Sequence, residues 1–137
     1  MLTAQEAKDK CLQIWRYIEE HVTDPAWREK VIDRYTGSWS GLDENIKKYA
    51  LRQLFPNDDP NSQCYLCEFH RIQSDGSWES CQDCSLGRGE PGWGLAPCMW
   101  SRRPYASFTL NVRRERWSRA AAAAQRLVDT VKDWQVD

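Results

Sequence analysis

The sequence predicts a single α+β domain with a helical first part, a central β-hairpin and a long C-terminal helix. Apolar residues recur at helical spacing near both ends of the chain, whereas the middle is rich in cysteine, glycine and proline. The length of 137 residues suits one domain, 1–137. We expect a helical part over 1–56, a hairpin and Gly/Pro loop over 61–104, and a strand-like lead-in followed by the C-terminal helix over 105–137.

Three helices are predicted in the first part. Thr3 and Glu6 have the spacing of a capping box, so the first helix should begin there. A short second helix is expected from Trp27 to Tyr35, because Asp24 precedes a proline suited to the first helical position. Ser40 marks a third start. The apolar residues expected on the inner faces are Cys11, Ile14, Trp15, Ile18, Val22, Trp27, Val31, Tyr35, Leu42, Ile46, Tyr49, Ala50 and Leu54.

The C-terminal part changes its period along the chain. Residues 106–112 alternate between apolar and polar side chains, which is the two-residue period of a β-strand, but whether they form a strand or a helix stays open. From Arg113 the spacing becomes helical, and we expect this long helix to pack back on the first helices. Its predicted inner face comprises Trp117, Ala120, Ala121, Ala124, Leu127, Val128, Val131 and Trp134.

Two Cys-x-x-Cys motifs lie in the middle of the chain at a separation close to that of zinc sites. Four thiolates complete the tetrahedral coordination of a structural Zn²⁺. A hairpin turn, Ser74 to Ser77, lies between the motifs and would bring them to the open end of a short ribbon, where zinc would clip the strands together. The predicted fold is thus a small helical domain with a zinc-clipped β-hairpin of the zinc-ribbon or knuckle type. The expected metal ligands are Cys64, Cys67, Cys81 and Cys84.

Other roles for the cysteines are weaker. A redox dithiol lacks the surrounding βαβ pattern, and a disulfide framework lacks an export signal. His70 faces Cys81 across the predicted hairpin, and Cys98 returns after the glycine loop. Whether either of them joins the metal site stays open. Cys11 is expected to be a small buried apolar residue.

The cysteine pattern resembles a known group of proteins. Cys-x-Leu-Cys-x-x-His over 64–70 and Cys-x-x-Cys-x-Leu-Gly over 81–87 are followed by Cys98 and by Pro104-Tyr105 before an alanine-rich helix. This arrangement, over about residues 64–128, is similar to small zinc-knuckle proteins common in bacteriophage genomes. The resemblance implies a phage accessory protein that acts in the host cytoplasm, in a counter-defence role, with the four knuckle cysteines as zinc ligands.

No catalytic motif accompanies the cysteines in the sequence. A zinc deaminase needs His-x-Glu beside its cysteine pair, and a zinc hydrolase needs an open coordination position with a general base. The chain also lacks a GxxxxGK[ST] loop and a GxSxG elbow. We therefore expect a non-enzymatic binding protein.

Arginine is concentrated before and within the C-terminal helix. Guanidinium groups bind phosphates and carboxylates through two parallel hydrogen bonds, and tryptophan is frequent at binding hot spots. The expected partner is a host protein or a small anionic, nucleotide-like ligand. The alternatives are a nucleic-acid-binding zinc module that uses the arginine cluster, and a structural component of a larger assembly. The candidate ligand- or partner-binding residues are Arg102, Arg103, Arg113, Arg114, Arg116, Trp93 and Trp100.

Composition and hydropathy bound the location of the protein. The 19 basic and 20 acidic residues nearly balance, so the chain is not a globally basic nucleic-acid binder. No window approaches the run of about 18 apolar residues that spans a bilayer. The N-terminal residues lack the layout of a secretory signal. We expect a cytoplasmic protein without membrane association, and a homo-oligomer stays open as its assembly.

Overall fold

The computed structural model describes residues 2–60, 64–66 and 104–136, and the elements of this part of the chain are all helices. The predicted α+β class is therefore wrong. The hairpin that it required falls within 67–103, outside the described residues. The elements are α1 (Ala4–His21), α2 (Pro25–Arg34), α3 (Leu42–Leu54), α5 (Pro104–Arg113) and α6 (Trp117–Lys132).

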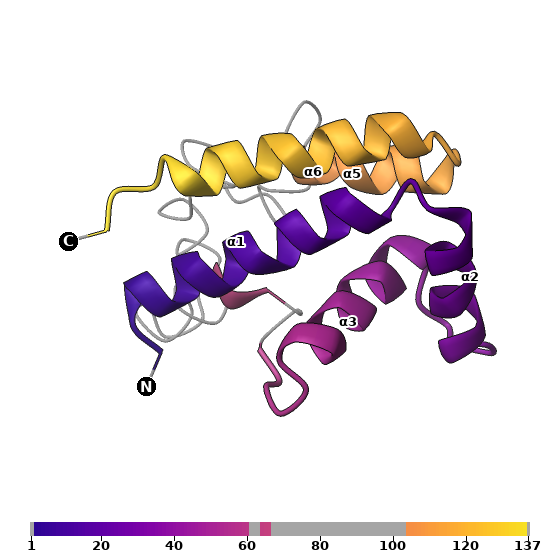
Figure 1. The fold of residues 1–137 in the computed structure, drawn as a ribbon, viewed down its shortest axis with the longest axis horizontal. Helices are drawn as coiled ribbons and strands as arrows, with labels where there is room; N and C mark the ends of the chain where they lie inside the picture. The colour runs from indigo at the N-terminus through magenta and orange to yellow at the C-terminus, as the bar shows by residue number, and fades with distance from the viewer. Residues whose placement is uncertain (1, 61–63, 67–103, 137) are drawn as a thin grey trace.

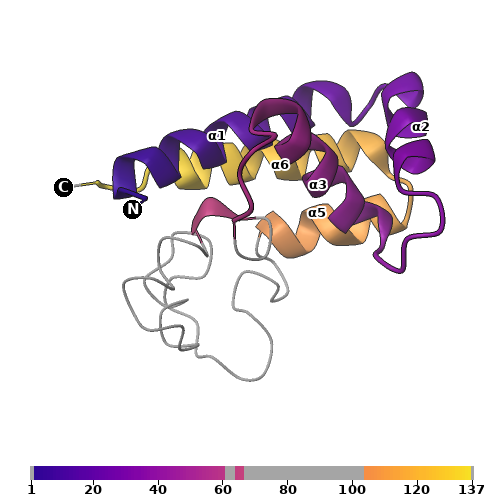
Figure 2. The ribbon, with the colours of Figure 1, turned by 90° about the horizontal axis from the view of Figure 1, so that it is seen from below.

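The first and last helices form the long axis of the molecule. α1 and α6 pack against each other, and α5 packs against α6 on the side where α3 also lies (Figures 1 and 2). The fully buried ring of Phe108 joins these layers, since its centre lies 5.0 Å from that of Trp15 in an edge-on contact. The C-terminal helix thus packs back on the first helices, as the sequence predicts.

The first two predicted helix starts are confirmed. Thr3 Oγ1 accepts a hydrogen bond from the amide of Glu6 at 3.1 Å. Asp24 Oδ1 accepts one from the amide of Ala26 at 3.0 Å, with Pro25 at the first helical position. The third helix differs from the expectation, because its N-cap is Gly41 and no side chain caps it.

Whether residues 106–112 form a strand or a helix, which the sequence leaves open, is settled by the structure: they lie in α5. Their alternation also satisfies a helical period, which places Tyr105, Phe108 and Val112 on one buried face. Pro104 is suited to the first position of a helix. Helices α1, α3 and α6 cover this face. As a helix, α5 pairs its backbone N–H and C=O groups within itself and needs no neighbouring strand.

Aromatic contacts hold α2 against the end of the bundle. The indole N–H of Trp27 donates a hydrogen bond to the hydroxyl of Tyr17 on α1 at 3.0 Å. The Trp27 ring also meets Tyr49 of α3 edge-on, with ring centres 5.6 Å apart. α2 therefore lies across the end of the bundle where α5 turns into α6 (Figure 1).

None of the helices in the described part of the chain combines the length and the apolar character needed to cross a membrane.

Candidate functional site

The first candidate site lies where α5 turns into α6. The amide of Glu115 donates to the carbonyl of Val112 at 3.0 Å, and the amide of Arg116 donates to the carbonyl of Asn111 at 2.8 Å. This pair of hydrogen bonds is a Schellman motif, which needs a left-handed residue. Glu115 occupies that position with φ 55°, a conformation that costs a non-glycine residue about 1 kcal/mol. The turn sets the directions of four arginines, which we call the arginine corner: Arg113, Arg114, Arg116 and Arg119.

One arginine of the corner is tied to the interior. The Nε atom of Arg113 lies 3.7 Å from Oδ1 of Asp43, whose side chain is 3% exposed. Within the described residues, this Oδ1 accepts no hydrogen bond. Since a buried carboxylate needs a compensating charge, Arg113 is placed to stabilise Asp43.

The other three arginines of the corner point their charge outward. Arg114, Arg116 and Arg119 are exposed, and in the described part of the chain none of them pairs with a carboxylate. Beside them, the guanidinium of Arg28 on α2 stacks 4.2 Å from the ring centre of Trp117. Arg28 is itself held by the carbonyl of Val22 at 2.9 Å. Trp117 is therefore fixed next to a group of uncompensated positive charges.

The surface of the corner is open and electropositive. A shallow depression is lined by Arg116, Trp117, Ser118 and Arg119. No side chain caps the start of α6, so the first amide groups of the helix add partial positive charge. Binding sites for small molecules are usually concave and enclose most of their ligand. The corner is better suited to a carboxylate- or phosphate-bearing surface of a larger partner.

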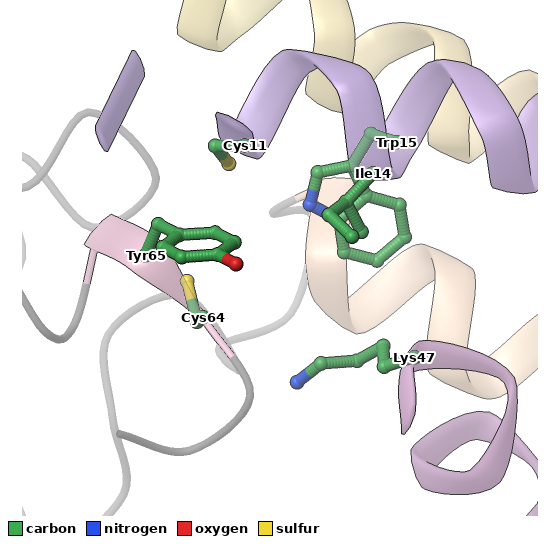
Figure 3. A pocket seen from close by; sticks show the side chains of 6 residues that line it. All are labelled: Cys11, Ile14, Trp15, Lys47, Cys64 and Tyr65. Carbon is green, nitrogen blue, oxygen red and sulfur yellow. The ribbon is translucent and has the colours of Figure 1, made fainter. Parts of the chain in front are cut away.

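A second candidate site lies near the start of α5, where a small cavity separates α1, α3 and the segment that carries Cys64 (Figure 3). Its volume is about 10 Å³, which holds about one water molecule and excludes an organic substrate. We call it the lysine cavity. The described residues that line it are Cys11, Ile14, Trp15, Lys47, Cys64 and Tyr65.

Lys47 brings a positive charge into the interior. Its side chain is on α3 and the residue is 4% exposed. The Nζ atom donates a hydrogen bond to the hydroxyl of Tyr105 and lies 4.5 Å from the centre of that ring. Burial raises the pKa of Tyr105 to about 12, so the phenol is neutral at physiological pH. Burial opposes the charge of Lys47, but Tyr105, Cys64 and Glu44 outweigh burial and raise the pKa of Lys47. Lys47 is therefore a buried ammonium ion.

A polar network anchors the Cys64 segment to α1. The hydroxyl of Tyr65 donates to Oδ2 of Asp58 at 2.8 Å, and Nζ of Lys10 donates to the same oxygen at 2.7 Å. These hydrogen bonds, that of Lys10 first, hold the pKa of Asp58 below its ordinary value. The network fixes Tyr65, and with it the neighbouring Cys64, at the edge of the lysine cavity.

The structure describes only part of the predicted site residues. Cys64 is half-buried beside the lysine cavity, and Arg113, Arg114 and Arg116 meet at the arginine corner. Across residues 2–60, 64–66 and 104–136, no group of three or more His, Cys, Asp or Glu could hold a metal ion. The predicted site residues that lie outside the described residues are Cys67, His70, Cys81, Cys84, Trp93, Cys98, Trp100, Arg102 and Arg103.

Sequence reasoning missed the charged residues that face the interior. Asp43 and Lys47 are one helical turn apart, and Lys47 follows Ile46 at the edge of the apolar stripe of α3. That position was the available signal, but lysine and aspartate are rarely buried, so periodicity favours exposure. Arg28 gave no signal, because its contact with Trp117 joins residues far apart in the sequence.

Comparisons of the sequence with protein families, with curated proteins and with solved structures found no match. The function is therefore inferred from the residues and from the two sites described above.

Proposed function

We propose that this protein is a non-enzymatic, zinc-stabilised binding protein whose arginine corner docks an acidic surface of a partner protein. The observation that carries the proposal is the exposure of Arg114, Arg116 and Arg119 without carboxylate partners in the described chain. Their charge is available to a ligand, and forked guanidinium groups match carboxylates. The fixed Trp117 adds a flat apolar face of the kind found at binding hot spots.

A protein partner is favoured over nucleic acid by an exposed leucine near the corner. Leu110 is 46% exposed and lies one helical turn before Arg113 and Arg114. Interfaces between proteins bury aliphatic side chains at their centre, whereas contacts to nucleic acid go mainly to phosphates and sugars. The resemblance to bacteriophage proteins makes a host protein the proposed partner, bound in the host cytoplasm in a counter-defence role.

The proposal includes a structural Zn²⁺ bound by the cysteines of the two Cys-x-x-Cys motifs. The donor set fits, because four thiolates are the preferred ligands of structural zinc. Cys64 lies at the edge of the lysine cavity, which Lys47 also lines. When bound, zinc would add its binding free energy to the stability of the fold. Its ligands would be Cys64, Cys67, Cys81 and Cys84.

The zinc is tested by native mass spectrometry of the protein purified from bacterial cells. We expect one zinc ion per chain, lost on Cys67→Ser substitution together with a lower melting temperature. A metal-free wild type whose mass shows paired disulfides would overturn this part of the proposal.

The partner is tested by affinity capture from a bacterial host lysate treated with nuclease. The corner variant carries Arg114→Glu with Arg116→Glu, and the control carries Arg16→Glu with Lys132→Glu. Both variants change the net charge equally at exposed positions. We expect one acidic protein to be captured by wild type and control, and lost with the corner variant. Loss from both variants would indicate an effect of net charge alone, and capture by all three would remove the corner from the proposal.

Nucleic-acid binding is measured in parallel. Fluorescence anisotropy with a labelled single strand and a labelled duplex would show affinity that falls steeply with salt, with a logarithmic slope of about −0.9 for each phosphate contacted on a duplex. If wild type shows such a slope and the corner variant does not bind, the partner is nucleic acid and not an acidic protein.

A further inference from the structure

We infer that Arg28 is a further binding residue of the docking surface: its guanidinium group, already seated on the ring of Trp117, recognises a carboxylate of the acidic partner through two parallel N–H donors. The inference rests on the proposed function, because it adds a residue to the same surface. Arg28 is half-buried and lies on α2, outside the run of arginines around the turn between α5 and α6. It assigns a planar carboxylate of the partner to this place.

Two contacts hold the Arg28 side chain in one position. The Cζ atom of its guanidinium group lies over the Trp117 ring, 4.2 Å from the ring centre. Its Nη1 atom donates to the carbonyl of Val22, the C-cap of α1, at 2.9 Å. These contacts join α2 to the end of α1 and to the start of α6, where the arginine corner lies (Figure 1). The guanidinium group is thus in place before any partner arrives.

Most of the hydrogen-bond donors of Arg28 remain available. A guanidinium group has five N–H donors, and the bond to Val22 uses one of them. Within the described residues, no carboxylate pairs with Arg28. The contact with the indole is a cation–π contact, which leaves the charge of the guanidinium group without a counter-ion. Arg28 therefore keeps its positive charge and the donors needed for a pair of carboxylate oxygens.

Trp117 links Arg28 to the rest of the docking surface. The indole lines the shallow depression of the corner together with Arg116, Ser118 and Arg119. Arg28 covers one face of the same ring. A partner that contacts the depression therefore reaches Arg28 within the width of one indole ring.

The energetic reason is that Arg28 is ordered before binding. Arg114, Arg116 and Arg119 are exposed and form no ion pair in the part of the chain that the structure describes, so a partner has to immobilise each of these long side chains. Arg28 has given up that freedom on folding, through the two contacts above. The indole also keeps water from one side of the guanidinium group, which strengthens its hydrogen bonds to a carboxylate. Arg28 should therefore contribute more to binding than any single arginine of the corner.

The experiment measures binding of a fluorescein-labelled hexaglutamate peptide to the full-length protein by fluorescence anisotropy at constant salt. Arg28→Lys keeps the positive charge but removes the forked donors. We expect the dissociation constant to rise about tenfold, which corresponds to the loss of one hydrogen bond to a charged group. Arg119→Lys should raise it less, since that side chain is not ordered in advance. Arg34→Lys, the same change at an exposed arginine of α2, should leave it within about twofold of wild type.

A second variant separates binding from folding. Arg28→Met keeps an apolar stem against Trp117 and removes the charge, so it should weaken the peptide at least as much as Arg28→Lys while circular dichroism shows an unchanged fold. If Arg28→Met does not fold, Arg28→Lys decides alone. Wild-type affinity in folded Arg28→Lys would show that Arg28 only holds α2 in place, and would overturn the inference while the arginine corner stands.

Two further outcomes have different meanings. A labelled oligothymidylate strand of similar charge that binds more tightly than hexaglutamate, and loses its affinity in Arg28→Lys, would replace the carboxylate by a phosphate group as the ligand of Arg28. Hexaglutamate that does not bind wild type, or that binds wild type and the Arg114→Glu with Arg116→Glu variant equally, would overturn the proposed function itself.

Discussion

Helices α3 and α5 meet at two charged contacts that differ in kind. At one, Lys47 contacts Tyr105; at the other, Asp43 contacts Arg113. Both are buried, Lys47 at 4% and Asp43 at 2% exposure, and they lie one turn apart on α3. However, Tyr105 is buried, whereas the Arg113 side chain is 66% exposed and reaches Asp43 from the surface.

This difference separates two uses of charge in one fold. Where both partners are buried, water does not compete for the hydrogen bond, so the position of the charge is fixed. Where one partner is exposed, water and salt screen the contact and the neighbouring arginines stay available to other molecules. The lysine cavity is thus suited to holding a fixed charge beside a cysteine, and the arginine corner to offering charge outward.

The largest effect is expected at the buried contact. Tyr105→Phe leaves the Lys47 ammonium buried without this acceptor, so the free energy of unfolding should fall by about 2 kcal/mol. Lys47→Met removes the charge and leaves only a neutral hydroxyl unpaired, which should cost about 1 kcal/mol. Urea denaturation followed by circular dichroism measures both values. Equal losses would show that the charge of Lys47 contributes nothing to the contact.

Alkaline pH should weaken the same contact. Burial raises the pKa of Tyr105 from 10.0 to about 12 in the folded protein, and the pKa of Lys47 is raised as well. The folded state therefore binds these protons more tightly than the unfolded chain, and stability present below about pH 10 is lost as the pH rises toward about 12. Denaturation curves across this range should show the loss, with a shallower decline in Tyr105→Phe. The same decline in both proteins would contradict the assignment to Tyr105.

The exposed contact should respond less. Arg113→Glu places a carboxylate against buried Asp43 and should lower the free energy of unfolding by about 1–2 kcal/mol. Arg114→Glu, on the next residue, faces solvent and should change it by less than about 0.5 kcal/mol. A comparison of the two midpoints in urea tests whether Arg113 differs from its neighbours. This difference is also why the partner-binding variant spares Arg113.

The smallest effect is expected at the turn between the two helices, and it is stabilising. Glu115→Gly relieves the left-handed conformation and should raise the free energy of unfolding by about 0.5–1 kcal/mol. Glu115→Ala removes the same charge but keeps the Cβ atom, so it should give no such gain. If alanine stabilises the protein as much as glycine does, the gain comes from removing the charge of Glu115 and not from relieving backbone strain.

The parts of the fold that local chemistry determines could be predicted from the sequence. Thr3, Asp24 and Pro25 begin their helices through contacts within one turn, so their roles are visible without the rest of the chain. Residues 106–112 could not be assigned to a strand or a helix from the sequence, because two periods fit the same residues. The choice between them is made by packing, since α6 and the more distant α1 and α3 contact α5.

The candidate sites divide in the same way. A run of arginines can be read directly from the sequence, and so Arg114 and Arg116 were predicted. The sequence could not predict that Arg113 differs from them by contacting a buried residue, because this depends on the position of Asp43 across a helix interface. Lys47 was missed for a related reason: its burial becomes favourable only when Tyr105 and Cys64 are brought to it.

The packing of α1 on α6 affects how the protein folds during its synthesis on the ribosome. These two helices lie far apart in the sequence, yet they bury their apolar faces on each other. During synthesis at about 5–20 residues per second, the apolar face of α1 leaves the ribosome several seconds before α6 exists to cover it. In that interval the nascent chain lacks the helix that covers residues such as Trp15 and Ile18, which are buried in the folded protein. The core closes only after translation has passed α6, so this protein folds late.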